Sequence, residues 1–337
     1  MFGYEMSEYD LKVYKEELES FLPDKIIDMH THVYKKELSL GIKRDKWTTR
    51  VAQDMTYEDL LKTFEDMYPG KKLKTVMMAM PVGFDLDKSN LYIEECINKG
   101  EKGLYCTKYS STPGEIEKAI TEHGFSGIKP YVNNSAPYIP LSELRIFDFL
   151  PHEHLKVMNE LGSIVLLHIG RDLRLKDPVN IAQLMEIEEK YPNVKLIVAH
   201  IGRAYTVDDI GNAFDTLKHT KNMMFDFCAN TLSEAMEECL KAVGPKRLMF
   251  GTDLPITKMR MRRIARNGTY CNIVPKGLYG DVSNDPHMLE TENELLTCFV
   301  YEEIRAFKRA AEKIGLTAKD VNDVFYGNAS KLFDINF

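Results

Sequence analysis

The chain lacks any run of apolar residues long enough to cross a membrane. No stretch approaches the roughly 20 apolar residues that a membrane-spanning helix needs. Residues 1–10 are acidic and aromatic, so they also lack the basic start and apolar core of a secretion signal. From these absences we expect a cytoplasmic protein with no membrane partner.

The chain has no excess of positive charge. The 337 residues include 44 Lys and Arg against 51 Asp and Glu, which gives a formal net charge of −7. Broad nucleic-acid binding depends on clustered Lys and Arg that neutralise phosphates. We therefore expect no nucleic-acid partner, and any functional cations must act locally.

Two cysteine- and glycine-based motifs are also missing. The six cysteines show no CxxC spacing, and a chain of this length does not need disulfides to hold its core, so we interpret them as reduced thiols. No glycine-rich phosphate loop follows the first predicted strand. A nucleotide cofactor is therefore not expected.

What the chain does have is a regular alternation of strand-like and helical patterns. Apolar or β-branched runs lie near residues 25–30, 73–80, 103–108, 126–131, 164–168, 195–199, 223–228 and 247–252. After an amphipathic segment at 9–21, helical patterns lie at 57–67, 91–99, 115–123, 154–161, 181–190, 207–218, 232–243, 292–314 and 318–324. Eight such repeats can close a parallel sheet without an exposed edge. We predict an α/β fold, a single (β/α)8 TIM barrel over 24–337 with a helical extension over 1–23; a doubly wound open sheet is the alternative.

Four of the predicted strands end in imidazole or carboxylate side chains. His30-Thr31-His32 closes the first run, and His168, His200 and Asp253 follow three later ones. Strand alternation points the two imidazoles of the HxH pair to the same side. The carboxyl ends of the strands carry the active site in TIM-barrel enzymes. The sequence therefore predicts one site at this rim.

In their order, these motifs resemble the amidohydrolase superfamily, in the branch of metal-dependent hydrolases and decarboxylases related to aminocarboxymuconate semialdehyde decarboxylase. HxH alone is a weak signal, but the ordered set is specific and covers roughly residues 24–335. The segments are Ile27-Asp28-Met29-His30-Thr31-His32, Gly127-Ile128-Lys129-Pro130, Val165-Leu166-Leu167-His168, Ile197-Val198-Ala199-His200-Ile201-Gly202, Phe250-Gly251-Thr252-Asp253-Leu254-Pro255 and Tyr326-Gly327-Asn328-Ala329-Ser330-Lys331-Leu332-Phe333.

The resemblance implies one divalent metal ion and a set of site residues. The implied metal ligands are His30, His32, His168 and Asp253. His200 would stand beside the ion as a catalytic group together with Asp253. Imidazoles and a carboxylate suit Zn²⁺ first, with Mn²⁺, Co²⁺ or Fe²⁺ as alternatives. Lys129 stands where some amidohydrolases carboxylate a lysine to bridge two metals, but we expect a wall residue or a substrate contact. A homodimer is compatible with the family.

Two arginines repeat the same spacing beyond the histidines. Arg171 and Arg203 each lie three residues after His168 and His200. Planar guanidinium groups suit bidentate binding of a carboxylate, so the pair could clamp an anionic substrate. Surface salt bridges are the equal alternative.

The chain after Asp253 has about 38 residues without a clear pattern before the next helix at 292. Loops this long are usually functional or disordered. Helical spacing would align Lys258, Arg262 and Arg266. We expect 256–291 to be a lid-like insertion in which Arg262 contacts an anionic substrate; a solvated helix or a subunit contact is the alternative.

Two reactions fit the predicted site. In hydrolysis of a small ester, lactone or amide that bears a carboxylate, Asp253 takes the proton of a metal-activated water and His200 stabilises the oxyanion. In decarboxylation of an unsaturated or aromatic acid, Asp253 or His200 protonates carbon before carbon dioxide leaves. Hydrolysis is favoured because it is the wider superfamily activity. A hydratase and a catalytically silent metal-binding barrel remain as alternatives.

Overall fold

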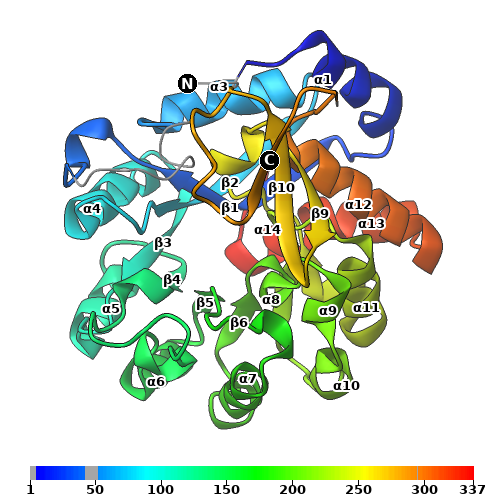
Figure 1. The fold of residues 1–337 in the computed structure, drawn as a ribbon. Helices are drawn as coiled ribbons and strands as arrows, with labels where there is room; N and C mark the ends of the chain where they lie inside the picture. The colour runs from blue at the N-terminus through cyan, green and yellow to red at the C-terminus, as the bar shows by residue number, and fades with distance from the viewer. Residues whose placement is uncertain (1–4, 42–51, 294) are drawn as a thin grey trace.

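The computed structural model describes residues 5–41, 52–293 and 295–337, so residues 1–4 of the predicted extension lie outside the described ranges (Figure 1). Its centre is a parallel sheet whose eight strands pair in chain order. They are β1 (Lys25–Val33), β2 (Lys72–Ala79), β3 (Lys102–Thr107), β4 (Gly127–Pro130), β5 (Ile164–Leu167), β6 (Lys195–Val198), β7 (Met224–Asp226) and β8 (Leu248–Met249). The backbone N–H of Asp253 donates to the carbonyl of His30 at 2.8 Å, and that of His32 to Leu254 at 2.9 Å. These bonds close the ring between its ends, which confirms the predicted (β/α)8 barrel.

Helices surround the sheet. They are α1 (Glu8–Val13), α3 (Tyr57–Met67), α4 (Leu86–Ile97), α5 (Pro113–Thr121), α6 (His152–Leu161), α7 (Pro178–Lys190), α8 (His200–Arg203), α9 (Val207–Ile210), α10 (Ala213–Leu217), α11 (Ser233–Val243), α12 (Phe299–Ile314), α13 (Ala318–Asn322) and α14 (Asn328–Phe333). Capping boxes at Thr56, Thr112 and Thr206 begin three of them. The single helix expected at 207–218 is two short helices, because Gly211 between them has φ 51°. In the described ranges, no helix combines the length and apolar character that crossing a bilayer requires.

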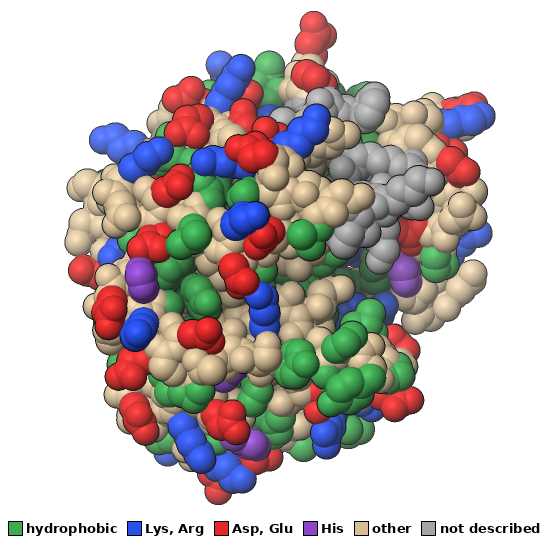
Figure 2. All heavy atoms as spheres, turned by 90° about the vertical axis from the view of Figure 1, so that its left-hand side faces the viewer, with side chains coloured by type: hydrophobic (Ala, Val, Ile, Leu, Met, Phe, Trp, Pro, Cys, Tyr) green, Lys and Arg blue, Asp and Glu red, His purple; other side chains and the backbone are tan. Residues whose placement is uncertain are grey.

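The outer face around α4 and α5 mixes acidic and basic side chains (Figure 2). A cavity of about 460 Å³ lies there, and Asp87, Glu94, Lys108 and Lys118 are among its lining residues. None of the predicted site residues lines it. The ends of the strands, rather than this cavity, therefore locate the candidate site.

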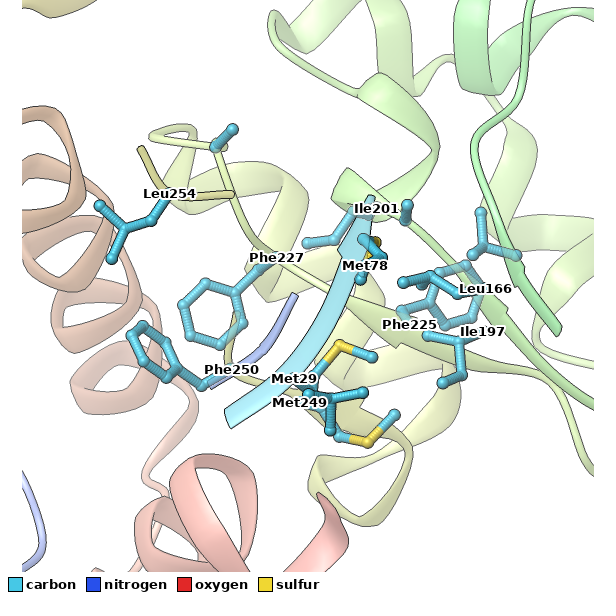
Figure 3. Packing of buried hydrophobic residues seen from close by; sticks show 14 of the residues in the cluster. Met29, Met78, Leu166, Ile197, Ile201, Phe225, Phe227, Met249, Phe250 and Leu254 are labelled. Atoms are coloured by element: carbon cyan, nitrogen blue, oxygen red, sulfur yellow. The ribbon is translucent and has the colours of Figure 1, made fainter. Parts of the chain in front are cut away.

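Buried hydrophobic side chains from several strands and from the chain after them form one continuous core (Figure 3). Met29, Leu166, Ile197, Phe225 and Met249 cluster at the centre of the close-up, and all are fully buried. Outside the strands, the rings of Phe227 and Phe307 stack 4.8 Å apart, and those of Phe250 and Phe325 are also 4.8 Å apart. This packing fixes the last two strands against α12 and the chain that follows it.

The segment after β8 differs from the prediction. It contains a separate three-stranded sheet, made of β9 (Arg262–Arg266), β10 (Thr269–Pro275) and β11 (Met288–Thr291). Asn267 and Gly268 join β9 to β10, and both have positive φ, 50° and 74°, as a tight hairpin turn requires. The expectation of an irregular 256–291 segment is therefore wrong, and α12 begins at Phe299 rather than at 292.

The predicted helical alignment of Lys258, Arg262 and Arg266 is also wrong, because Arg262–Arg266 forms the extended strand β9. Strand alternation places neighbours on opposite faces. Arg262 is exposed, whereas Arg263 is partly buried and its Nη1 donates to the carbonyl of Ala229 at 2.7 Å. Figure 1 shows β9 and β10 in front of the barrel, and this bond joins them to the turn after β7.

Candidate metal centre

His30, His32 and Asp253 meet where the first and last strands close the barrel. The Nε2 atoms of His30 and His32 lie 3.6 Å and 3.2 Å from Oδ1 of Asp253. One donor atom from each residue falls within 4.8 Å of the others. Asp253 has φ 63°, a left-handed conformation that costs a non-glycine residue free energy. The structure therefore brings together three of the four predicted ligands.

Hydrogen bonds on the far side of each imidazole fix its orientation. Nδ1 of His30 lies 3.0 Å from Oδ2 of Asp226, and Nδ1 of His32 lies 3.0 Å from the carbonyl oxygen of Ala79. A carboxylate and a carbonyl only accept, so each Nδ1 carries a proton and Nε2 is the nitrogen that faces Asp253. Burial and then the charge of Lys129 lower the pKa of His30 to about 3, which keeps the ring neutral. This is the arrangement that a metal-binding imidazole needs.

Asp28 and Gly251 support His30 from the backbone side. The Asp28 carboxylate accepts from the N–H of Thr252 at 2.9 Å and from its hydroxyl at 2.6 Å, which ties β1 to the chain after β8. Burial raises the pKa of Asp28 to about 7 despite these bonds. A Cβ at Gly251 would lie 2.7 Å from Cβ of His30, so only glycine fits beside the candidate ligand.

His168 and His200 form a second pair of imidazoles. Nε2 of His200 lies 3.1 Å from Nδ1 of His168, and Nδ1 of His200 lies 2.9 Å from the carbonyl oxygen of Cys228. Burial lowers the pKa of both imidazoles. In the described residues, His168 is in neither of the two donor groups that lie within 4.8 Å, so its role as a ligand stays a prediction.

A left-handed turn sets the direction of the chain after β6. The four residues His200, Ile201, Gly202 and Arg203 have φ of 58°, 47°, 60° and 62°. Each non-glycine residue in this conformation costs about 1–2 kcal/mol, so tertiary contacts must hold the turn. The turn brings Nη1 of Arg203 to 3.4 Å from the carbonyl oxygen of Arg171.

The remaining predicted substrate contacts have different surroundings. Nε of Arg171 lies 2.9 Å from Oδ1 of Asp177, which favours the salt-bridge alternative for this arginine. Lys129 is fully buried, and its Nζ lies 3.1 Å from Nε2 of His30. Burial lowers the pKa of Lys129. The lysine thus stands at the candidate metal centre itself.

Asp226 and Cys228 also lie at the site, although no sequence motif predicted them. Both are fully buried, and Sγ of Cys228 lies 3.0 Å from Nδ1 of His30 and 3.1 Å from Nδ1 of His200. Oδ1 of Asp226 also accepts from the backbone N–H of His200 at 2.7 Å. The signal was available, because Asp226 ends the seventh strand at the rim where the other site residues lie.

Eight parallel strands with imidazole and carboxylate groups at their carboxyl ends define a (β/α)8 barrel with a candidate metal centre. The sequence model of the amidohydrolase family matches residues 27–335, and the chain belongs to this family. It is therefore an enzyme of the amidohydrolase superfamily. No curated protein matches the chain.

Solved structures share the fold at low sequence identity. A probable 2-pyrone-4,6-dicarboxylic acid hydrolase from Acinetobacter baumannii is 16% identical, with a TM-score of 0.55 over 92% of this chain and 99% of its own. The 5-carboxyvanillate decarboxylase from Novosphingobium aromaticivorans, complexed with manganese, is 14% identical, with a TM-score of 0.57 over 94% and 97%. An amidohydrolase from Burkholderia multivorans with bound zinc is 13% identical, with a TM-score of 0.59 over 92% and 99%.

Proposed function

We propose that the protein is a metal-dependent hydrolase of a small ester, lactone or amide that carries a carboxylate. The observation that carries this proposal is the orientation of the site: the Nε2 atoms of two imidazoles face one carboxylate oxygen of Asp253, and partners on the far side of each ring hold it in place. The side chain of Asp253 is 18% exposed, so the cluster is open on that side. A structural zinc site would instead close its coordination with protein groups.

His30, His32 and Asp253 would hold a divalent ion, with His168 as the further predicted ligand. Zn²⁺ suits this donor set first, and Mn²⁺, Co²⁺ and Fe²⁺ are the alternatives. Such an ion, when bound, supplies Lewis acidity that lowers the pKa of water and polarises a carbonyl group.

Asp253 is suited to accept a proton at its carboxylate. Burial alone would raise its pKa, but the neighbouring imidazoles of His32 and His30 outweigh burial and lower it. The carboxylate is therefore ionised at neutral pH, as a general base must be, and it can pass the proton on to the leaving group.

His200 and Lys129 divide the remaining roles. Because Nδ1 of His200 donates to a carbonyl oxygen, its neutral ring has only an acceptor at Nε2. In this tautomer Nε2 accepts from Nδ1 of His168 at 3.1 Å. A neutral His200 therefore has no proton to donate to an oxyanion, in contrast to the role expected for it from the sequence. The Nζ of Lys129 is the donor beside His30, and we assign it to a negatively charged group of the substrate.

Decarboxylation remains the second candidate because Lys129 would also pair with a substrate carboxylate at the candidate metal centre. Water labelled with ¹⁸O separates the two reactions. A hydrolase transfers the label to the new carboxylate, whereas a decarboxylase releases carbon dioxide and leaves the product unlabelled. The substrate panel should contain carboxylate-bearing lactones, esters and amides beside aromatic and unsaturated acids. If a metal-loaded protein turns over none of them, the catalytically silent barrel is the better interpretation.

Metal content tests the site directly. We expect about one equivalent of divalent metal in the wild type after dialysis without chelator, because the donor set suits one ion. The double variant His30→Ala/His32→Ala should lose it, and His123→Ala, which removes a half-exposed imidazole, should keep it. Plasma mass spectrometry on the three proteins gives the result, and metal retained in the double variant would refute the ligand assignment.

A further inference from the structure

Both peptide groups that flank Ala229 are held by side chains from distant parts of the chain, one buried and one partly buried. The N–H of Ala229 donates to Oε2 of Glu303 at 2.7 Å, and its carbonyl accepts from Nη1 of Arg263 at 2.7 Å. Ala229 has φ 50°, a conformation that a non-glycine residue keeps only when its surroundings impose it. Glu303 lies on α12 and Arg263 on β9, so two separate elements impose this one.

Arg263 is itself fixed. Its Nε donates to Oδ1 of Asn272 at 2.9 Å, and Asn272 is the residue directly across the hairpin. Its guanidinium carbon lies 4.1 Å from the ring centre of Tyr205 and 4.8 Å from that of Phe299. Cation–π contacts and two hydrogen bonds together restrict the guanidinium to one position.

The buried position of the Glu303 carboxyl group costs the folded protein free energy. It is fully buried, and its second oxygen, Oε1, has no hydrogen-bond partner in the part of the chain that the structure describes. A buried polar atom without a partner costs about 1–3 kcal/mol. Burial raises the pKa of Glu303 well above its ordinary value. Packing alone does not explain a carboxyl group here, whereas the bond to Ala229 does.

The turn that these two residues hold leads directly to His200. The carbonyl of Cys228, just before Ala229, accepts from Nδ1 of His200 at 2.9 Å. The side-chain amide (Nδ2) of Asn230, the residue after Ala229, donates to the carbonyl oxygens of His200 at 3.3 Å and Ala204 at 3.0 Å. The residues on both sides of Ala229 therefore hydrogen-bond to the left-handed turn that begins at His200.

We propose that Arg263 and Glu303 are positioning residues that orient His200 by clamping the turn of residues 228–230. Through Arg263, the small sheet of β9, β10 and β11 becomes part of the site's framework. The effect on turnover rests on the role of His200 in the proposed function, whereas the positioning does not.

Thiol labelling of the folded protein tests the clamp without a substrate. Removing the bond from Arg263 frees the turn, so Arg263→Ala should label Cys228 roughly tenfold or more faster, as loss of a hydrogen bond to a charged group implies. The other five cysteines, all buried, should label as in the wild type. Arg262→Ala is the matched control, because Arg262 is the exposed neighbour on the same strand. Peptide mass spectrometry gives the rate for each cysteine.

A second readout follows His200 itself. Its Nδ1–H proton should give a protected resonance in protein labelled with ¹⁵N-histidine, and Arg263→Ala should abolish that protection. Arg263→Lys keeps the charge but cannot reach Asn272 and Ala229 together, so it should behave like the alanine variant. Glu303→Gln keeps an acceptor for the Ala229 N–H and should preserve the signal, whereas Glu303→Ala should lose it.

Three results would overturn the clamp: an Arg263→Ala variant that matches Arg262→Ala in both readouts, faster labelling of all six cysteines alike, or full rescue by Arg263→Lys. Once a substrate is identified, Arg263→Ala should lower kcat more than it changes KM, relative to the wild type. An intact clamp in a protein that turns over no member of the panel would refute the proposed function and leave the positioning in place.

Discussion

At the scale of single residues, the state of the candidate centre is decided by which nitrogen of each imidazole carries the proton. Asp226 and the carbonyl of Ala79 hold that proton on Nδ1 of His30 and His32. The two Nε2 atoms therefore face Asp253. Lys129 approaches the same Nε2 of His30 at 3.1 Å, so a bound ion and this ammonium group would compete for one lone pair.

Asp226→Asn tests this control of the proton. An amide can turn its NH₂ group to Nδ1 of His30, which favours the tautomer with the proton on Nε2 and removes the lone pair. We expect a loss of metal affinity of about 10–100-fold, as for other outer partners of metal-binding histidines. Competition with a chromogenic chelator measures the affinity.

The control for that experiment is Asp215→Asn, since the side chain of Asp215 is 75% exposed on α10. Circular dichroism should show the same fold in both variants. An Asp226→Asn protein that binds metal as tightly as the wild type would show that Asp226 does not set the tautomer.

The sequence was sufficient to place His30, His32 and Asp253 together, because strand alternation and the shared rim are properties of a parallel barrel. It was not sufficient for Asp226 and Cys228, because their contacts with His30 form only when the closed barrel brings the end of β7 near β1, on the other side of β8. Tautomers depend on such contacts, so they could not be predicted either.

At the scale of elements, eight strands follow from apolar runs of the right length, but two features required more. Asn267-Gly268 is a strong hairpin signal, and giving it weight would have predicted β9 and β10 in place of an irregular loop. The left-handed turn at His200–Arg203 has only Gly202 as a local signal. Its other residues are held by contacts with distant segments, which no local pattern encodes.

The contact between β4 and β5 depends on one glycine. A Cβ at Gly127 would lie 2.2 Å from the carbonyl oxygen of Ile164, a backbone atom that cannot move aside. Gly127→Ala should therefore destabilise the protein by about 3 kcal/mol, at the upper end for overpacking. Gly114→Ala is the control, because nothing lies within 4 Å of its added Cβ. Thermal unfolding of the two variants measures the difference, and equal midpoints would contradict the contact.

At the scale of the whole molecule, Asp10 ties the N-terminal helix α1 to the far end of the chain. Its buried carboxylate accepts from the hydroxyl of Thr297 at 2.6 Å, 287 residues away, and from the guanidinium of Arg260. Burial raises the pKa of Asp10, but the bonds from Arg260, Ser7 and Thr297 outweigh burial and lower it.

This lowered pKa predicts a dependence of stability on pH. A carboxyl group with a lower pKa in the folded state stabilises the protein above its unfolded pKa, and the contribution is lost as pH falls through the folded value. Asp10→Asn should cost about 3 kcal/mol at pH 7, because Arg260 is left without its buried partner. The difference from the wild type should shrink below about pH 4.

Free energies of unfolding in urea at several pH values give this comparison. Asp24→Asn is the control, since the side chain of Asp24 is 95% exposed. A difference between wild type and Asp10→Asn that stays constant from pH 7 to pH 3 would contradict the assignment of the pKa shift to Asp10.

The closure of the barrel between β1 and the chain after β8 determines when the candidate metal centre can form during synthesis. His30 and His32 are synthesised early. Asp253 and Thr252 are synthesised much later, since Thr252 lies 224 positions after its partner Asp28. A nascent chain without Asp253 therefore lacks one candidate ligand and the hydrogen bonds that close the barrel beside His30 and His32. Metal uptake in this protein should therefore mark the end of folding, and we expect a chain that ends before Asp253 to bind no metal ion at this site.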